Sequence, residues 1–266
     1  MLTKFTALAM GVLLSVSAMA ADMATADMAT LTRQAQSGDA AAQFDLAYEY
    51  YQQGNHAKAF EWFTKAAHQG DAQAQYNLGV MYAQGLGVRQ DYHKAFEWFT
   101  KAAKQGYADA QFNLALMYAQ GDGVRQDYHK AFEWFTKAAN QGLAEAQFSL
   151  GVMYDEGQGV RQDYYKAVEW YTKAAHQGDA AAQSNLGVMY DKGHGVRQDY
   201  QKAIEWYTKA AHQGRAAAQS NLGAMYYNGH GVRQNKSTAK RYYGQACDNG
   251  NQPGCDNYRI LNEQGY

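Results

Sequence analysis

The sequence predicts an all-α solenoid, in which pairs of helices stack along the chain. The first observation is a fixed period, because glycines that each end a helix-like run recur every 36 residues. These glycines are Gly70, Gly106, Gly142, Gly178, Gly214 and Gly250. The second observation is composition: one proline and 14% aromatic residues in 266 favour an ordered core over a disordered polymer.

Each unit of the period contains two helical patterns. In the unit 71–106, the run 72–84 places small and apolar residues on one face at helical spacing, and we name it helix A. The run 92–104 repeats this pattern as helix B, and Asp91 stands where a helix cap is expected. Gly85 and Gly87 suit the turn between the helices, because glycine readily adopts positive φ.

The same pattern divides most of the chain into repeats. Five full units follow a shorter one that lacks the glycine-rich insertion, and the flanking segments 21–38 and 251–266 are expected to cap the two ends. The predicted repeats are 39–70, 71–106, 107–142, 143–178, 179–214 and 215–250.

A glycine in the middle of helix A indicates close packing. Gly79 recurs as Gly151, Gly187 and Gly223, although glycine costs about 1 kcal/mol relative to alanine in a helix. We therefore expect helix B to approach closely here, with Trp98 and its equivalents filling the space beside the glycine.

The unit also carries a recognisable motif. Residues 74–106 read A-x-x-x-L-G-x-x-Y-x-x-G-x-G-V-x-x-D-x-x-K-A-x-x-W-x-x-K-A-A-x-x-G. This pattern resembles the Sel-one-like repeat family, a branch of the tetratricopeptide superfamily, over about residues 39–250. The resemblance implies a right-handed superhelix of antiparallel helix pairs, usually a non-catalytic scaffold or adaptor. The last unit departs from the pattern, with Asn235, Lys236 and Tyr242 where Asp, Tyr and Trp recur.

The resemblance also indicates where a partner would bind. In the related tetratricopeptide fold, helix A lines the concave surface, so its second face is expected to hold a protein or peptide partner. Asparagine amides there can both donate to and accept from a peptide backbone. The alternative is that the aromatic residues pack between helices and the asparagines only solvate a surface. The candidate groove residues are Phe44, Tyr48, Tyr76, Asn77, Asp109, Phe112, Asn113, Glu145, Phe148, Asn185 and Asn221.

The N-terminus predicts export. Lys4 precedes an uncharged run of twelve residues, and Ala18-Met19-Ala20 follows, which is typical of a signal peptide (1–20) cleaved after Ala20. The run is shorter than the roughly 20 residues that a membrane-spanning helix needs. We therefore expect a periplasmic or secreted protein without membrane insertion, for which cell-envelope components are candidate partners.

Export permits a disulfide between the two cysteines, Cys247 and Cys255, which we expect to pair, with two free thiols as the alternative. They also resemble the helix-clipping pair of bacterial cysteine-rich members of the repeat family.

Other kinds of chemistry are weakly indicated. The formal charge of −1 disfavours nucleic-acid binding. Histidines such as His68, His176 and His212 recur at equivalent positions of different repeats, too far apart to share a zinc ion, so we expect no metal and no cofactor.

One catalytic pattern remains. Ser237 to Lys240 match the S-x-x-K motif of penicillin-binding proteins and β-lactamases, activities linked to some cysteine-rich members, but the accompanying S-D-N and K-T-G motifs are missing. Ser237 is instead expected to cap a helix B. We expect a non-enzymatic scaffold, with such a hydrolase as the alternative and a secreted factor that binds host proteins as a third reading.

Overall fold

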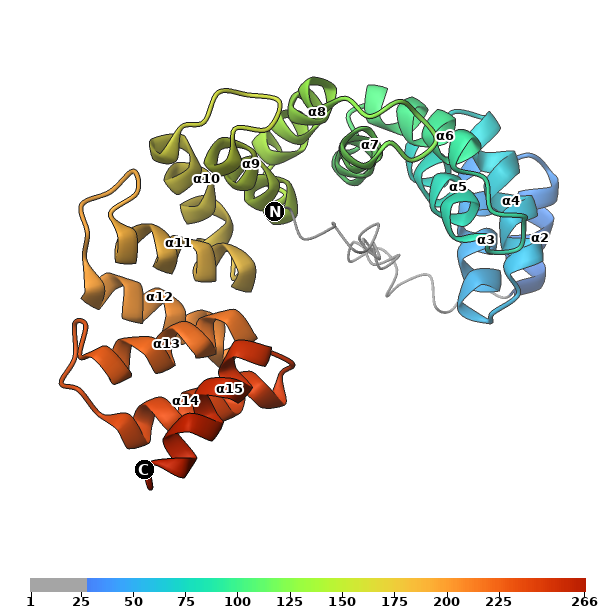
Figure 1. Cartoon of the computed structure of the whole chain (residues 1–266). Helices are drawn as coiled ribbons and strands as arrows, with labels where there is room; N and C mark the ends of the chain where they lie inside the picture. Colours follow the sequence, from blue (N-terminus) through green and yellow to red (C-terminus); the bar gives the residue numbers. More distant parts are fainter. Residues whose placement is uncertain (1–27) are drawn as a thin grey trace. The chain divides into compact units, whose positions relative to one another are not determined.

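The computed structural model describes residues 28–266, which form fourteen α-helices and no β-strand within that range (Figure 1). The predicted signal peptide, 1–20, lies outside the described residues. The chain divides into two compact units, one ending at Gln141 and the other running from Gly142 to Tyr266, and each is described by itself.

The first unit contains seven of the described helices. They are α2 (Met28–Gln36), α3 (Ala40–Gln52), α4 (His56–His68), α5 (Ala72–Gln84), α6 (Tyr92–Lys104), α7 (Ala108–Gln120) and α8 (Tyr128–Asn140). The second unit contains α9 (Ala144–Glu156), α10 (Tyr164–His176), α11 (Ala180–Lys192), α12 (Tyr200–His212), α13 (Ala216–Asn228), α14 (Lys236–Asp248) and α15 (Gln252–Glu263). Within each unit, every helix packs against the next along the chain.

The predicted helices A and B of the unit 71–106 are confirmed residue for residue as α5 and α6. We call α3, α5, α7, α9, α11 and α13 the A helices, and α4, α6, α8, α10, α12 and α14 the B helices. Asp91 caps α6 as expected, since its Oδ1 accepts from the backbone N–H of Lys94 at 3.0 Å.

The turn between the helices also joins neighbouring repeats. Gly85 ends α5 with φ of 73°, and Gly87 has φ of 67°, both in the left-handed region. A Cβ at Gly87 would lie only 2.2 Å from the carbonyl oxygen of His56, in the first turn of α4. Glycine at this position therefore lets the turn of one repeat rest on the preceding B helix.

The mid-helix glycine faces a different ring from the one expected. A Cβ at Gly79 would come within 2.7 Å of the Phe99 ring, so Phe99, and not Trp98, rests on the glycine. Tyr171, Tyr207 and Tyr243 cover Gly151, Gly187 and Gly223 in the same way. The expectation of close packing is confirmed, but the large residue is the one after the tryptophan, because that position faces the A helix of its own repeat.

A pair of glutamines fastens each repeat. Gln75, which is 6% exposed, donates from Nε2 to the carbonyl oxygen of Ala67 in the preceding B helix at 3.1 Å. Its Oε1 accepts from Nε2 of Gln105 at 2.8 Å, and Gln105 also donates to the carbonyl oxygen of Gly70 at 2.9 Å. The same pair of glutamines recurs as Gln43–Gln69, Gln111–Gln141, Gln147–Gln177 and Gln183–Gln213, and in the last repeat asparagine replaces the second glutamine, as Gln219–Asn249.

The C-terminal end is fixed by the disulfide. Cys247 and Cys255 are bonded, with their Cα atoms 4.5 Å apart, which joins α14 to α15. The expected pairing is confirmed, and it indicates an oxidising compartment. None of the described helices is long and apolar enough to cross a membrane.

Candidate functional site

The A helices of the second unit approach one another directly. Successive A helices α9, α11 and α13 are in contact, whereas the successive B helices of the same unit, α10, α12 and α14, do not come comparably close. Because neighbours in a curved stack are closest on the inner side, the A helices line the inner side of this unit. We call the face of the A helices that bears the candidate groove residues the A face.

The candidate residues of the first unit are largely buried. Tyr76, Asn77, Phe112 and Asn113 are at most 7% exposed, whereas Phe44, Tyr48 and Asp109 are half-buried. The ring of Phe44 lies 5.5 Å from that of Phe63, and the ring of Phe112 lies 5.5 Å from that of Phe135. These aromatic side chains therefore pack between helices, so a partner could touch only their edges and the half-buried residues around them.

Tyr76 and Asn113 form a buried polar pair on this face. The Tyr76 ring lies 5.2 Å from that of Tyr107, and its hydroxyl accepts from Nδ2 of Asn113 at 3.3 Å. Burial raises the pKa of Tyr76, and Asp109 raises it further, so the phenol stays neutral. The Oδ1 atom of Asn113 is buried and accepts no hydrogen bond within the described residues.

The candidate residues of the second unit are more open. Asn185, Asn221 and Phe148 are half-buried, and Glu145 is exposed. The Phe148 ring lies 5.9 Å from that of Tyr171, whose hydroxyl donates to Oδ2 of Asp155 at 3.2 Å. Asn185 and Asn221 are thus accessible polar groups at equivalent positions on the A face of this unit.

The A helices of the first unit are acidic. Helices α3, α5 and α7 contain no lysine or arginine, and Asp39 and Asp71 cap two of them. Asp45 lies among these acids, and burial, followed by the charges of Asp39, Asp71 and Glu49, raises its pKa to about 6. The net charge of −1 for the whole chain does not reveal this local negative charge. The sequence does show it, because charged residues are distributed differently over the A and B helices.

The S-x-x-K motif does not form a catalytic pair in the structure. Ser237 is exposed in the first turn of α14, and Nζ of Lys240 donates to the backbone carbonyl oxygen of Tyr266. The expectation that Ser237 caps this helix is wrong, because Asn235 is the cap and accepts from the N–H of Thr238 at 2.9 Å. Across residues 28–266, no cluster of His, Cys, Asp and Glu has the arrangement of a metal site.

Stacked helix pairs joined by close glycine contacts define an α-solenoid of the tetratricopeptide type. Six consecutive segments match the Sel1 repeat, at residues 40–71, 72–107, 108–143, 144–179, 180–214 and 216–251. The chain therefore belongs to the Sel1 repeat family, whose members are typically non-enzymatic scaffolds for protein interactions.

Two solved structures are similar over most of the chain. The first is c5321, a protective antigen of uropathogenic Escherichia coli strains, with 40% identity, a TM-score of 0.85 and 90% of this chain covered. This chain spans about half of that protein, 52% of its length. The second is a Sel1 repeat protein from Oxalobacter formigenes, with 32% identity, a TM-score of 0.79, and coverage of 84% of this chain and 90% of that one. A comparison with curated proteins finds no significant match.

Proposed function

We propose that the protein is an exported, non-catalytic scaffold that binds an extended segment of a partner protein along the A face. The observation that carries this proposal is unused hydrogen-bonding capacity. The half-buried amide of Asn221 has no hydrogen-bond partner within the described residues. Buried polar groups are normally paired, and a peptide backbone supplies both the donor and the acceptor that such amides need.

The charge of the first unit indicates the kind of segment. Because its A helices carry acids and no lysine or arginine, the segment should be basic. A cationic side chain beside Asp45 would also relieve the repulsion that this carboxylate experiences from Asp39, Asp71 and Glu49.

Export is supported by two features. The disulfide between Cys247 and Cys255 is typical of an oxidising compartment, and the N-terminal twenty residues have the pattern of a signal peptide. The similar E. coli protein is described as a protective antigen, which is compatible with a protein that reaches the envelope or the exterior. The partner would then be an envelope component or a host protein.

The test is selection of peptides from a random display library on the chain from Ala21 onward, followed by affinity measurements with the selected peptides. We expect Lys- and Arg-rich segments, with affinity that falls as salt concentration rises. The double variant Asn185→Ala, Asn221→Ala should weaken binding about tenfold or more, since it removes the half-buried amides of two A helices.

The matched control is Gln201→Ala on the exposed side of α12, which should leave the affinity unchanged. Selected peptides that keep full affinity for the double variant and for Asp45→Asn would contradict the A face as the binding surface.

A further inference from the structure

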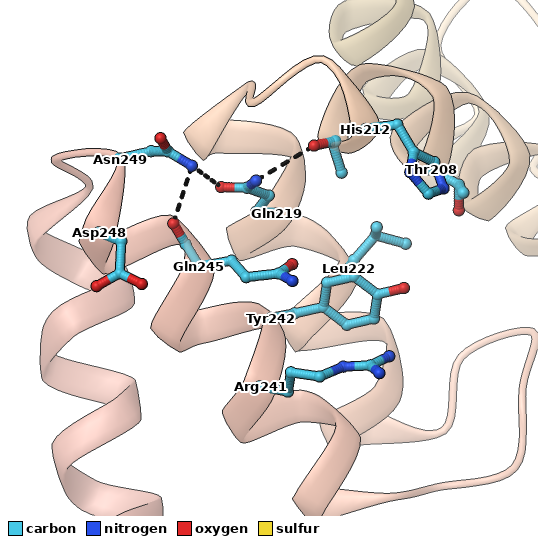
Figure 2. Close-up of a pocket in the computed structure, with 10 residues that line it drawn as sticks. Thr208, His212, Gln219, Leu222, Arg241, Tyr242, Gln245, Asp248 and Asn249 are labelled. Atoms are coloured by element: carbon cyan, nitrogen blue, oxygen red, sulfur yellow. Dashed lines mark hydrogen bonds between the residues drawn. The ribbon is translucent and has the colours of Figure 1, made fainter.

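A cavity of about 430 Å³ lies among α12, α13 and α14 (Figure 2). His212 of α12, Leu222 of α13, and Arg241, Tyr242 and Asp248 of α14 are among its lining residues. Such a volume falls within the range of small-ligand sites, roughly 300–1,000 Å³.

Earlier repeats show what normally occupies this place. In the repeat 71–106, Trp98 occupies the equivalent place. Its ring meets that of His68 in the preceding B helix edge-on, with the ring centroids 5.2 Å apart. The ammonium group of Lys101 lies 3.7 Å from the centre of the same ring. Trp206 repeats the arrangement, with its ring 5.5 Å from that of His176 and 4.0 Å from Nζ of Lys209.

The last repeat lacks this tryptophan. Tyr242 stands at the tryptophan position, and its ring stacks on Tyr226 with the centroids 5.6 Å apart. The position of the covering lysine is taken by Gln245. Ala211, on the cavity wall, is half-buried, whereas the equivalent Ala67 is only 2% exposed beneath Trp98. The apolar wall that an indole covers elsewhere is therefore open here.

The charge beside the cavity is reversed as well. Arg241 occupies the position at which Glu61 and Glu169 pair with Lys65 and Lys173 in other repeats. Its guanidinium group lies 5.2 Å from the centre of the Tyr242 ring and forms no ion pair with any described residue. A carboxylate is the group that would complement it.

We propose that this cavity binds an aromatic side chain of a partner polypeptide, with an acidic residue next to it in sequence. The ring covers Ala211 beside His212, as the chain's own tryptophan covers the equivalent alanine in earlier repeats, and the carboxylate pairs with Arg241. None of the candidate groove residues lines this cavity, so the two sites use different residues.

The test uses the blocked dipeptide acetyl-(5-fluorotryptophyl)-glutamate amide, whose fluorine signal is observed by NMR without interference from the protein's five tryptophans. We expect saturable binding to the whole chain, and weaker binding of the corresponding tryptophyl-glutamine probe. The Arg241→Glu variant should remove the preference for glutamate over glutamine.

The decisive variant is Tyr242→Trp, Gln245→Lys, which restores the residues of the other repeats and fills the cavity from within. Binding should fall at least about tenfold, while the melting temperature should rise or stay the same. Ala211→Leu, which fills the cavity from α12, provides a second filled form if the first does not fold. The A-face variant Asn185→Ala, Asn221→Ala should bind the probe normally. No saturable binding to the wild-type chain, or full affinity in both filled variants, would overturn the proposal.

Discussion

The side chain of Gln105 donates to that of Gln75 across 2.8 Å, although thirty residues separate them in the sequence. Gln75 sits in the first turns of an A helix and Gln105 at the end of the B helix of the same repeat. Because Gln75 also bonds to Ala67 of the preceding repeat, this one buried amide holds together a hairpin and its neighbour.

We expect Gln75→Ala to destabilise the chain by about 2 kcal/mol. The change removes the hydrogen bonds that Gln75 makes to the carbonyl of Ala67 and to the amide of Gln105, and an intramolecular hydrogen bond contributes about 0.5–1.5 kcal/mol. Urea denaturation followed by circular dichroism measures the loss. Gln73→Ala, at an exposed position of the same helix, should change stability by less than about 0.5 kcal/mol. Equal effects of the two substitutions would refute the role assigned to the glutamine pair.

The mid-helix glycines should differ in their tolerance of alanine. Gly79→Ala should change stability by no more than about 1 kcal/mol, because Ala47 and Ala115 already occupy this position in repeats whose B helix carries phenylalanine. Gly151→Ala should cost about 1–3 kcal/mol. A methyl there would lie 2.4 Å from the Tyr171 ring, which the hydrogen bond to Asp155 holds in place.

Denaturation curves of the two variants give the comparison directly. The matched rescue is Gly151→Ala with Tyr171→Phe, which removes the hydroxyl that anchors the ring. A rescue variant no more stable than Gly151→Ala alone would show that the tyrosine hydroxyl is not the reason why alanine is unfavourable at position 151.

Asp45 should make the stability of the chain depend on pH. Its pKa rises from an ordinary 3.8 to about 6 in the folded chain, so the folded state binds the proton more tightly. The contribution of this carboxyl to stability therefore becomes less favourable as pH rises from about 4 to 6, and it is constant above that range. Asp45→Asn, which installs the residue found at Asn77 and Asn113, should stabilise the chain at pH 7 on the order of 1 kcal/mol, allowing for solvent screening. Thermal unfolding at pH 7 and pH 3.5 should show this gain shrinking at the lower pH; a constant gain would contradict the titration of Asp45.

Loss of the disulfide should loosen the C-terminal end alone. Closing so short a loop is worth about 2.5 kcal/mol in the chain-entropy treatment. In a stack whose repeats contact only their neighbours, the effect should stay local. Hydrogen exchange of Cys247→Ala, Cys255→Ala should quicken in α14 and α15 and remain unchanged in α3 to α7. Faster exchange throughout would mean that the bond organises the whole stack.

The S-x-x-K motif should be catalytically silent. Lys240 is engaged with the carbonyl of Tyr266, and no hydrogen bond joins it to Ser237 in the described structure. We expect purified protein and Ser237→Ala to leave nitrocefin equally intact in a spectrophotometric assay. Hydrolysis that disappears in the Ser237→Ala variant would establish the hydrolase alternative instead.

Local structure followed closely from local sequence. The bounds of α5 and α6, the cap at Asp91 and the positive φ of Gly85 were all predictable, because they depend on residues within a few positions of one another. The candidate groove was less predictable. The sequence places Tyr76 and Asn113 on a common face, but it does not tell that Tyr107 and Phe99 cover that face.

The sequence by itself determined the period, the helices, their caps and the family pattern, since a 36-residue repeat states which positions are equivalent. Only the tertiary structure decided which ring rests on Gly79, that Gln75 is buried against the preceding repeat, and that the place a tryptophan fills in earlier repeats is open beside Tyr242. Equivalence in sequence fixes a residue's position along its helix, whereas burial depends on the rotation and spacing of the helices packed against it.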